Sequence, residues 1–219
     1  MAAARSKERD NGCWRGRGDP GPYVPGVPAE VPKARSLKAL FEAMDCCTRC
    51  ELARERTQVV RGVGPAPAEL MLVGEAPGAD EDRKGAPFVG RSGRLLDKLL
   101  AANGIERESV FITNIVACRP PGNRTPKAAE IRAHAPWLEE QIRLVEPKVV
   151  VTLGRVALSY FLPGAKVTEV RGTPQTIERN GRSILLLPLY HPSAILRRRE
   201  LLSAMEEDFA KIPALLRRS

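Results

Sequence analysis

The chain has 219 residues, of which 43% are apolar, and it carries a formal net charge of +9 at pH 7. That length accommodates one α/β domain with a short extension. No apolar run approaches the roughly 18 residues of a membrane span, and the first residues lack the apolar centre of a signal peptide, so we expect a cytoplasmic protein with no membrane partner. The positive charge favours a polyanionic partner such as nucleic acid, although an arginine-rich surface can also serve solubility alone.

Residues 1–34 form the first distinct segment. They are rich in glycine, proline and charged residues and show no apolar period. This composition predicts a disordered basic extension, with a single domain over residues 35–219. A helix is predicted to begin after Ser36, a good N-cap, because apolar residues then recur at helical spacing as far as Met44.

The end of this helix carries a group of cysteines. Cys46, Cys47 and Cys50 lie within the stretch "DCCTRC", and Cys118 follows far downstream. In a reducing compartment such spacing favours metal ligands or free thiols over a disulfide framework. Sites of this kind usually have four protein ligands, which leaves a fourth to be identified.

Four short apolar runs follow, and each has the composition of a buried strand. They span residues 69–74, 109–117, 148–154 and 183–190. Helical patterns at 91–104 and 125–147 separate the first three runs, and another at 154–164 follows the third. This alternation predicts an α/β fold, a three-layer sandwich around a central, mostly parallel four-stranded sheet.

Local signals predict where several elements begin and end. Asn103–Gly104 predicts the end of one helix, and Thr125 with Pro126 predicts the start of the next. Pro136 predicts a break or kink inside that helix. Asn180–Gly181 predicts the tight turn of a hairpin that leads into the last strand. The chain is expected to end in a helix with an apolar stripe, formed by Leu202, Met205, Phe209 and Ile212.

The unusual polar segments of the chain fall at the carboxyl ends of the predicted strands. "GEAPGADEDRKGAPFVGRSG" follows the first strand, Asn114 lies on the second, and "HPSAILRRR" follows the last. Because open α/β sheets bind ligands at these ends, we expect a binding site where the three segments meet.

Four segments resemble the motifs of the family 4 uracil-DNA glycosylases, an iron–sulfur branch of their superfamily: "GEAPGADEDRKGAPFVGRSGRLLD", "TNIVACRPPGNRTP", "EPKVVVTLG" and "YHPSAILR". The resemblance covers about residues 36–212 and includes the pair Cys47 and Cys50. It implies a DNA repair enzyme that hydrolyses the N-glycosidic bond of deoxyuridine, releases free uracil and leaves an abasic site. The implied partner is uracil-containing DNA, double- or single-stranded, and we expect the enzyme to be a monomer.

Three residues in these segments suit the recognition of a base that has been flipped out of DNA. Phe88 is the candidate stacking face, unless it is a core residue of its loop. Asn114 has one donor and one acceptor, which suit uracil and not cytosine, and such a mismatch can discriminate by roughly 10⁴-fold; otherwise it ties down a turn. The resemblance places His191 opposite uracil O2, where charge develops, and the alternative is a neutral cap of the next helix.

The residue that activates water stays open. In the best-known branch of the superfamily an aspartate positions the water, and here that slot holds Ala76. We expect Glu75 to organise the pocket and the water, and Glu81 to crowd the methyl group of thymine, unless either carboxylate caps the glycine-rich turn. Gly74 and Gly78 let the backbone approach the base. The expected catalytic residues are therefore His191, Asn114 and Glu75.

The segment "HPSAILRRR" predicts contact with DNA. Leu196 is the expected wedge into the duplex, and Ser193 and Arg197 are expected to contact the DNA backbone. The alternative is an ordinary amphipathic start of a helix.

The resemblance implies a structural 4Fe-4S cluster held by four cysteines. Cys47, Cys50 and Cys118 match three of them, and the fourth slot holds His134. Histidine ligates some iron–sulfur centres, so we expect His134 to complete the site. The alternatives are ligation by Cys46, a zinc ion on the same residues, or a surface histidine beside an incomplete site.

Two other functions compete with uracil excision. One keeps the fold but prefers another deaminated base such as hypoxanthine. The other is a metal-bearing DNA-binding protein without catalysis, which predicts tight binding and no abasic product.

Overall fold

The computed structural model describes residues 31–218, so residues 1–30 of the predicted extension lie outside the described residues. Residues 31–34 lead into the first helix with neither helix nor strand. The carbonyl of Ala34 accepts a hydrogen bond of 2.6 Å from Arg143, which anchors this short lead. The division of the chain at residue 34 stays a prediction.

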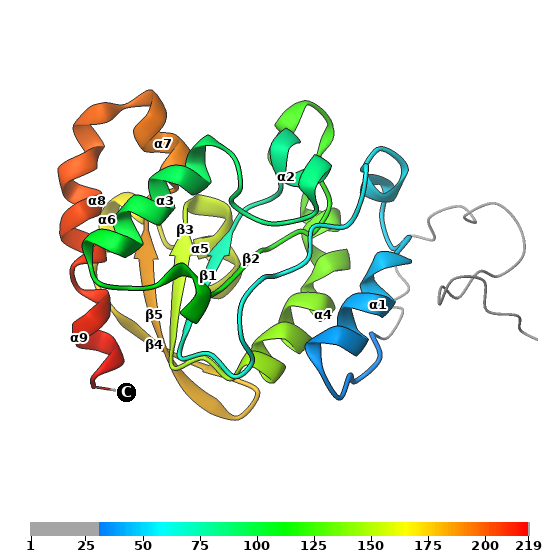
Figure 1. Cartoon of the computed structure of the whole chain (residues 1–219), viewed down its shortest axis with the longest axis horizontal. Coiled ribbons are helices and arrows are strands. Elements are labelled where there is room, and N and C mark those ends of the chain that lie inside the picture. Colours follow the sequence, from blue (N-terminus) through cyan, green and yellow to red (C-terminus); the bar gives the residue numbers. More distant parts are fainter. Residues whose placement is uncertain (1–30, 219) are drawn as a thin grey trace, which may run out of the picture.

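A five-stranded sheet forms the centre of the fold (Figure 1). Its strands are β1 (Leu70–Gly74), β2 (Phe111–Asn114), β3 (Val149–Leu153), β4 (Gln175–Arg179) and β5 (Arg182–Leu189), in the order β2-β1-β3-β5-β4. All neighbours are parallel except β4 and β5. The α/β sandwich with a mostly parallel sheet is confirmed. The sheet has five strands instead of four because the first arm of the hairpin also joins it.

Helices connect the strands and cover both faces of the sheet. They are α1 (Leu37–Asp45), α2 (Ala79–Lys84), α3 (Arg91–Ala102), α4 (Ala128–Val145), α5 (Arg155–Phe161), α6 (Val167–Val170), α7 (Pro192–Arg197), α8 (Leu202–Phe209) and α9 (Ile212–Leu216). Within residues 31–218, no helix combines the length and the apolar character that a membrane crossing requires.

Two apolar layers hold the helices to the sheet. On one face, Met71 and Val150 belong to a buried cluster that also includes residues of α4 and α5. On the other face, Leu72 and Val151 belong to a cluster with residues of α3, α8 and α9. Successive strand residues point to opposite faces. Because both faces are covered, the central strands appear in the sequence as continuous apolar runs.

Helix α1 packs outside α4 in a third apolar cluster, which includes Leu40, Met44 and Trp137. The Ser36 side chain accepts a hydrogen bond of 3.3 Å from the amide of Ala39, so the predicted N-cap is confirmed. This packing carries the cysteine segment, which follows α1, to the side of α4.

The predicted turns are confirmed. Helix α3 ends directly before Asn103, and Gly104 has a φ of 67°. In the hairpin, Asn180 and Gly181 have φ values of 52° and 72°, and this left-handed pair is what a two-residue turn of type I′ requires.

Of the break or kink predicted at Pro136, the break does not occur, because α4 has buried side chains on both sides of the proline and their packing outweighs one lost hydrogen bond. Two other predictions about the helices are wrong. Thr125 does not cap α4, which begins after Lys127; the Thr125 side chain bonds Glu75 instead. The last helix is divided into α8 and α9, although Met205, Phe209 and Ile212 of its apolar stripe are buried and Leu202 is half-buried.

The carboxyl ends of β1, β2, β3 and β5 meet at one edge of the sheet. Strand β1 lies beside β3, but the chain passes from β1 to β2 on the other side, so the strand order reverses between β1 and β3. Such a reversal opens a crevice at the carboxyl ends. The segments with the predicted site residues all leave the sheet at this edge.

Candidate active site and metal centre

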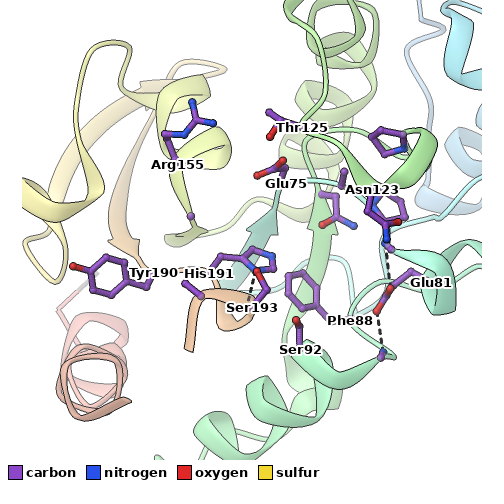
Figure 2. Close-up of a pocket in the computed structure, with 18 of the residues that line it drawn as sticks. Glu75, Glu81, Phe88, Ser92, Asn123, Thr125, Arg155, Tyr190, His191 and Ser193 are labelled. Carbon is purple, nitrogen blue, oxygen red and sulfur yellow. Dashed lines mark hydrogen bonds between the residues drawn. The ribbon is translucent and has the colours of Figure 1, made fainter. Parts of the chain in front are cut away.

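A cavity of about 930 Å³ opens at the carboxyl edge of the sheet (Figure 2). Its walls come from the ends of the parallel strands and from α2, α3 and α7. Most of the predicted base-binding residues line it, namely Ala76, Gly78, Glu81, Phe88, Asn114 and His191. The cavity is therefore built where the sequence predicts the site.

Gly74, at the end of β1, lets two of these side chains approach each other. A Cβ at Gly74 would lie 2.4 Å from Oδ1 of Asn114 and 2.7 Å from Cζ of Phe88, so any side chain here would displace both. The rings of Phe88 and His191 lie 5.7 Å apart between centroids and are tilted by 30°. An aromatic face, an amide and an imidazole thus converge on one volume.

His191 is the N-cap of α7, and this role fixes its tautomer. The backbone N–H of Ser193 lies 3.1 Å from Nδ1 of His191. Because an amide N–H can only donate, Nδ1 carries the lone pair, and the neutral ring carries its proton on Nε2. Burial, assisted by the charge of Arg197, lowers the pKa of His191 to about 4, so the ring is neutral near pH 7. His191 therefore has both roles that the sequence offered as alternatives, cap and pocket residue.

Gly154 gives His191 room at the end of β3. Its φ of 94° lies in the region that favours glycine, and a Cβ here would lie 2.9 Å from Cβ of His191. Any other residue would strain the turn and push the imidazole out of its place.

Glu75 follows β1, and its carboxylate lies next to Thr125, with Arg155 turned toward them across the cavity (Figure 2). Burial raises the pKa of Glu75 above its usual range, while the hydrogen bond with Thr125 and the charges of Arg155 and Arg197 oppose that rise. A carboxylate balanced between burial and specific partners inside a cavity is typical of a functional site.

Glu81 uses its carboxylate to hold backbone. Its Oε1 accepts hydrogen bonds from the amides of Val89 (3.0 Å) and Gly90 (2.8 Å), and its Oε2 accepts one from Gly78 (3.2 Å). It thereby ties the loop after β1 to the loop that carries Phe88. This is the turn-capping role that the sequence left as an alternative, and the side chain also lines the cavity.

The predicted DNA-contact residues lie on α7, of which Ser193 and Arg197 line the cavity. Leu196 is 39% exposed and is one of two large apolar side chains exposed among residues 31–218. Arg197 is exposed and lines the cavity. The Ser193 hydroxyl is turned inward, 2.8 Å from Nδ1 of His191, so its first partner is the imidazole.

The predicted metal ligands lie away from this cavity, beside α4. Burial raises the pKa of Cys50 to about 12 and also raises that of Cys118. Cys47, Cys50 and Cys118 influence one another electrostatically, which places the three thiols close together. Buried neutral thiols of this kind become thiolates when a metal binds.

His134 supplies a fourth donor to this group. Its Nδ1 lies 2.9 Å from the Glu130 carbonyl oxygen and 3.9 Å from Sγ of Cys50. A carbonyl only accepts, so Nδ1 carries the proton and Nε2 carries the lone pair. Nε2 is buried without a hydrogen-bond partner among the described residues, which is the state expected of a metal ligand whose other nitrogen is fixed by a backbone carbonyl. His134 is only 3% exposed, so the surface alternative is wrong.

The residue types of these donors bear on which group they fit. Among the described residues, no three Cys, His, Asp or Glu side chains are arranged to hold a metal ion as they stand. Zinc holds all its ligands at about 2.0–2.3 Å from one centre, whereas a four-iron cluster binds each ligand through a different iron atom and spaces them more widely. Cys46, the other candidate ligand, is turned back along α1, with Sγ 3.8 Å from the carbonyl oxygen of Glu42. Both groups accept thiolate and imidazole donors, so the three thiols and His134 provide a donor set that suits either.

Sequence reasoning missed several residues around the cavity. The local sequence predicts a helix cap at Thr125 and gives no role to Arg155, although its place directly after a strand is typical of a site residue.

The buried carboxylate of Asp82 is a further feature that the sequence does not predict. Asp82 is 3% exposed, and its carboxylate accepts hydrogen bonds from the amide (3.0 Å) and the hydroxyl (2.7 Å) of Thr57. This contact joins α2 to the segment after the cysteines, and no local pattern announces it.

Comparison with known proteins agrees with this geometry. A family model described as "Uracil DNA glycosylase superfamily" matches residues 61–217. A protein of Thermotoga maritima named "Type-4 uracil-DNA glycosylase" is 44% identical over 83% of this chain and 95% of its own length. Proteins with the same name from Sulfurisphaera tokodaii and Archaeoglobus fulgidus are 43% and 40% identical, each over 82% of this chain and over 84% and 93% of their own lengths.

Proposed function

This chain belongs to the uracil DNA glycosylase superfamily, and we propose that it is a DNA repair enzyme that hydrolyses the N-glycosidic bond of deoxyuridine in DNA. The products are free uracil and an abasic site. The observation that carries the proposal is the convergence of Phe88, Asn114 and His191 on one cavity at the carboxyl edge of the sheet. The relatives that match this chain over most of their length bear the name of this activity.

The cavity supports recognition of a flipped base. Uracil would stack on the Phe88 ring, while the Asn114 amide pairs with O4 and N3–H of the base. Asn114 is buried, so water would not compensate a polar group that its amide leaves unpaired. Cytosine presents the opposite donor and acceptor pattern, so its binding would leave buried polar groups unpaired, at a cost of roughly 10⁴-fold in discrimination.

The neutral imidazole of His191 supports the bond-breaking step. As the glycosidic bond lengthens, negative charge develops on the uracil ring, and the Nε2–H of His191 would donate to O2. A fixed donor placed where charge develops contributes about 3 kcal/mol to transition-state stabilisation. The donor is already in the required tautomer because the Ser193 amide occupies Nδ1.

Glu75 supports the sugar side of the reaction. The breaking bond leaves positive charge on the deoxyribose, and an ionised Glu75 would stabilise that charge and orient the attacking water. Burial raises the pKa of Glu75, and the hydrogen bond from Thr125 and the charge of Arg155 oppose that rise and so favour the carboxylate form. Ala76 lines the same wall and offers no carboxylate.

Helix α7 supports contact with DNA around the flipped nucleotide. Leu196 would enter the space that the base leaves, and Arg197 would bind a phosphate. Ser193 would contact the DNA backbone on the same side. Uracil-containing DNA, double- or single-stranded, is the proposed partner, and the enzyme acts as a monomer. Such a substrate places it in the cytoplasm, associated with the nucleoid in a prokaryote.

The cysteine group supports a structural 4Fe-4S cluster, with Cys47, Cys50, Cys118 and His134 as its ligands. When bound, the cluster would cross-link the segment after α1, the loop after β2 and α4, and supply no step of the hydrolysis. A zinc ion on the same residues is the alternative.

The decisive experiment measures release of uracil from a duplex with one U:G pair. The wild type should release uracil and leave an abasic site, and His191→Ala should abolish both. A panel of duplexes, each with one damaged base such as hypoxanthine, shows whether another base is preferred. Tight DNA binding without any abasic product would overturn the proposal in favour of a non-catalytic DNA-binding protein.

A further inference from the structure

The backbone of Phe88 adopts an unfavourable conformation. Its φ is 52°, in the left-handed region, and it is the one aromatic residue among the non-glycine residues with positive φ in the described chain. Two of the others are asparagines, which tolerate this region, and the last is the C-cap of α4. For a residue with a bulky side chain the left-handed conformation is disfavoured by about tenfold or more. Such strain persists only where surrounding structure imposes it.

Arg107 contacts the backbone of the loop that carries Phe88. It lies in the short turn between α3 and β2, and its Nη2 donates hydrogen bonds to the carbonyl oxygens of Pro87 (3.0 Å) and Phe88 (3.2 Å). Its Nη1 pairs with Asp97 of α3. One planar guanidinium therefore grips two successive carbonyls and is itself anchored to the neighbouring helix.

The rest of the loop leaves Phe88 little freedom to relax. Gly93 passes so close that a Cβ on it would lie 1.7 Å from the Phe88 carbonyl oxygen. On the other side, Glu81 accepts hydrogen bonds from the amides of Val89 and Gly90. Arg107 and Glu81 thus hold the peptide groups on either side of the Phe88 ring, which lies in the cavity opposite His191 (Figure 2).

We propose that Arg107 is a positioning residue for base recognition, which holds Phe88 in its left-handed conformation and so presents the ring to the flipped base. This inference rests on the proposed function, because it assigns the ring to a base. Arg107 lies outside every motif that the sequence displays, and it acts only through backbone carbonyls. Its ion pair with Asp97 only orients the guanidinium. Both side chains of the pair are partly exposed, and such pairs contribute little to stability by themselves.

The test compares Arg107→Ala and Arg107→Lys with the matched control Asp97→Asn. Lysine keeps the charge but cannot grip two carbonyls with a planar fork. Both Arg107 variants should lose about tenfold in the single-turnover rate of uracil excision, while the dissociation constant for undamaged duplex and the urea midpoint stay close to wild type. Asp97→Asn, which leaves both carbonyl contacts in place, should lose less than threefold, well short of the tenfold expected from loss of the clamp.

A double-mutant cycle with Phe88→Gly separates positioning from general structure. Glycine adopts a φ of 52° without strain and has no ring to position. Arg107→Ala should therefore have no further effect on the excision rate in the Phe88→Gly background. An equal tenfold loss in both backgrounds, or wild-type excision by Arg107→Lys and Arg107→Ala, would overturn the inference. A wild-type enzyme that releases no uracil would instead overturn the proposed function.

Discussion

The amide of Ser193 donates a hydrogen bond to Nδ1 of His191 over 3.1 Å. The same contact caps α7 and determines which nitrogen of the imidazole bears the proton. A helix start therefore controls the chemistry of the cavity, and this control can be tested through the backbone.

Removal of the Ser193 amide proton should impair catalysis. Ser193→Pro deletes this donor at an early position of α7, where proline is tolerated, and frees the imidazole to adopt the other tautomer. Loss of one donor to developing charge costs about 10²–10³-fold in rate. Ser193→Ala keeps the amide and loses only the hydroxyl, so its excision rate should lie between those of wild type and Ser193→Pro. The reverse order of the two variants in single-turnover assays would contradict the tautomer argument.

The rate of excision should fall at acid pH as Glu75 is protonated, with no step at the pH where an ordinary histidine titrates. The pKa of His191 is lowered to about 4, so the profile should show no step near the ordinary histidine value of about 6.5. Burial raises the pKa of Glu75, and the active form is the carboxylate. As the pH falls through that raised pKa, Glu75 gains a proton and the rate falls.

The matched variant for this profile is Glu75→Gln, which cannot ionise. It should be slower than wild type at neutral pH, and its rate should not change over the acid limb. An acid limb that persists unchanged in Glu75→Gln would assign the titration to another group.

Truncation of Leu196 should affect duplex substrates selectively. As a wedge, the exposed side chain would act only in a duplex, where a flipped base leaves a gap between its stacked neighbours. Leu196→Ala should therefore excise uracil from a duplex about tenfold more slowly, since unstacking one step costs a few kcal/mol. Excision from a single strand of the same sequence should equal that of wild type. Equal losses on both substrates would assign Leu196 to the fold of α7.

The metal centre can be tested by its spectrum and composition. Purified wild type should contain iron and absorb broadly near 400 nm, as iron–sulfur proteins do, with about four iron atoms per chain. His134→Cys should keep both properties because a thiolate replaces the nitrogen ligand, and His134→Ala should lose iron. Stoichiometric zinc without this absorption in the wild type would establish the alternative ion.

Asp82 and Thr57 should behave as one energetic unit. Asp82→Ala removes the charged acceptor that the amide and hydroxyl of Thr57 share, and hydrogen bonds to a charged group contribute about 1.5–3 kcal/mol, so it should lower the free energy of unfolding by about 2 kcal/mol. Thr57→Val loses only the hydroxyl and should cost about 1 kcal/mol. Urea unfolding of the double variant should cost clearly less than the two single losses together, because they remove the same contact. Strict additivity would show that the two side chains stabilise the fold independently.

Much of the fold could be predicted because its signals are local. The central strands appear as apolar runs since they are buried on both faces, and the Asn180–Gly181 turn carries its own conformational signature. Strand β4 escaped the count of strands because Ile177 is its one buried residue, so it lacks an apolar run. An edge strand of this kind is defined by its partner β5 and not by its own composition.

The unpredicted features depend on partners that are distant in the chain. Thr125 carries a good local signal for a helix cap, but its side chain instead forms a hydrogen bond with the carboxylate of Glu75, which follows β1. Pro136 breaks helices in isolation, yet burial of α4 on both sides of it holds the helix together. Arg107 is hardest to predict, because the carbonyls that it grips exist in every residue and leave no trace in the sequence.

The place of β5 in the sheet has a consequence for synthesis of the protein. His191 follows β5, which lies inside the sheet between β3 and β4 and not at its edge. On the ribosome, the segments with Glu75, Phe88 and Asn114 emerge long before this strand does. Under the proposed function, the nascent chain therefore lacks the hydrogen-bond donor His191 until β5 has inserted into the sheet. Catalytic competence therefore arises late, in the same event that completes the core.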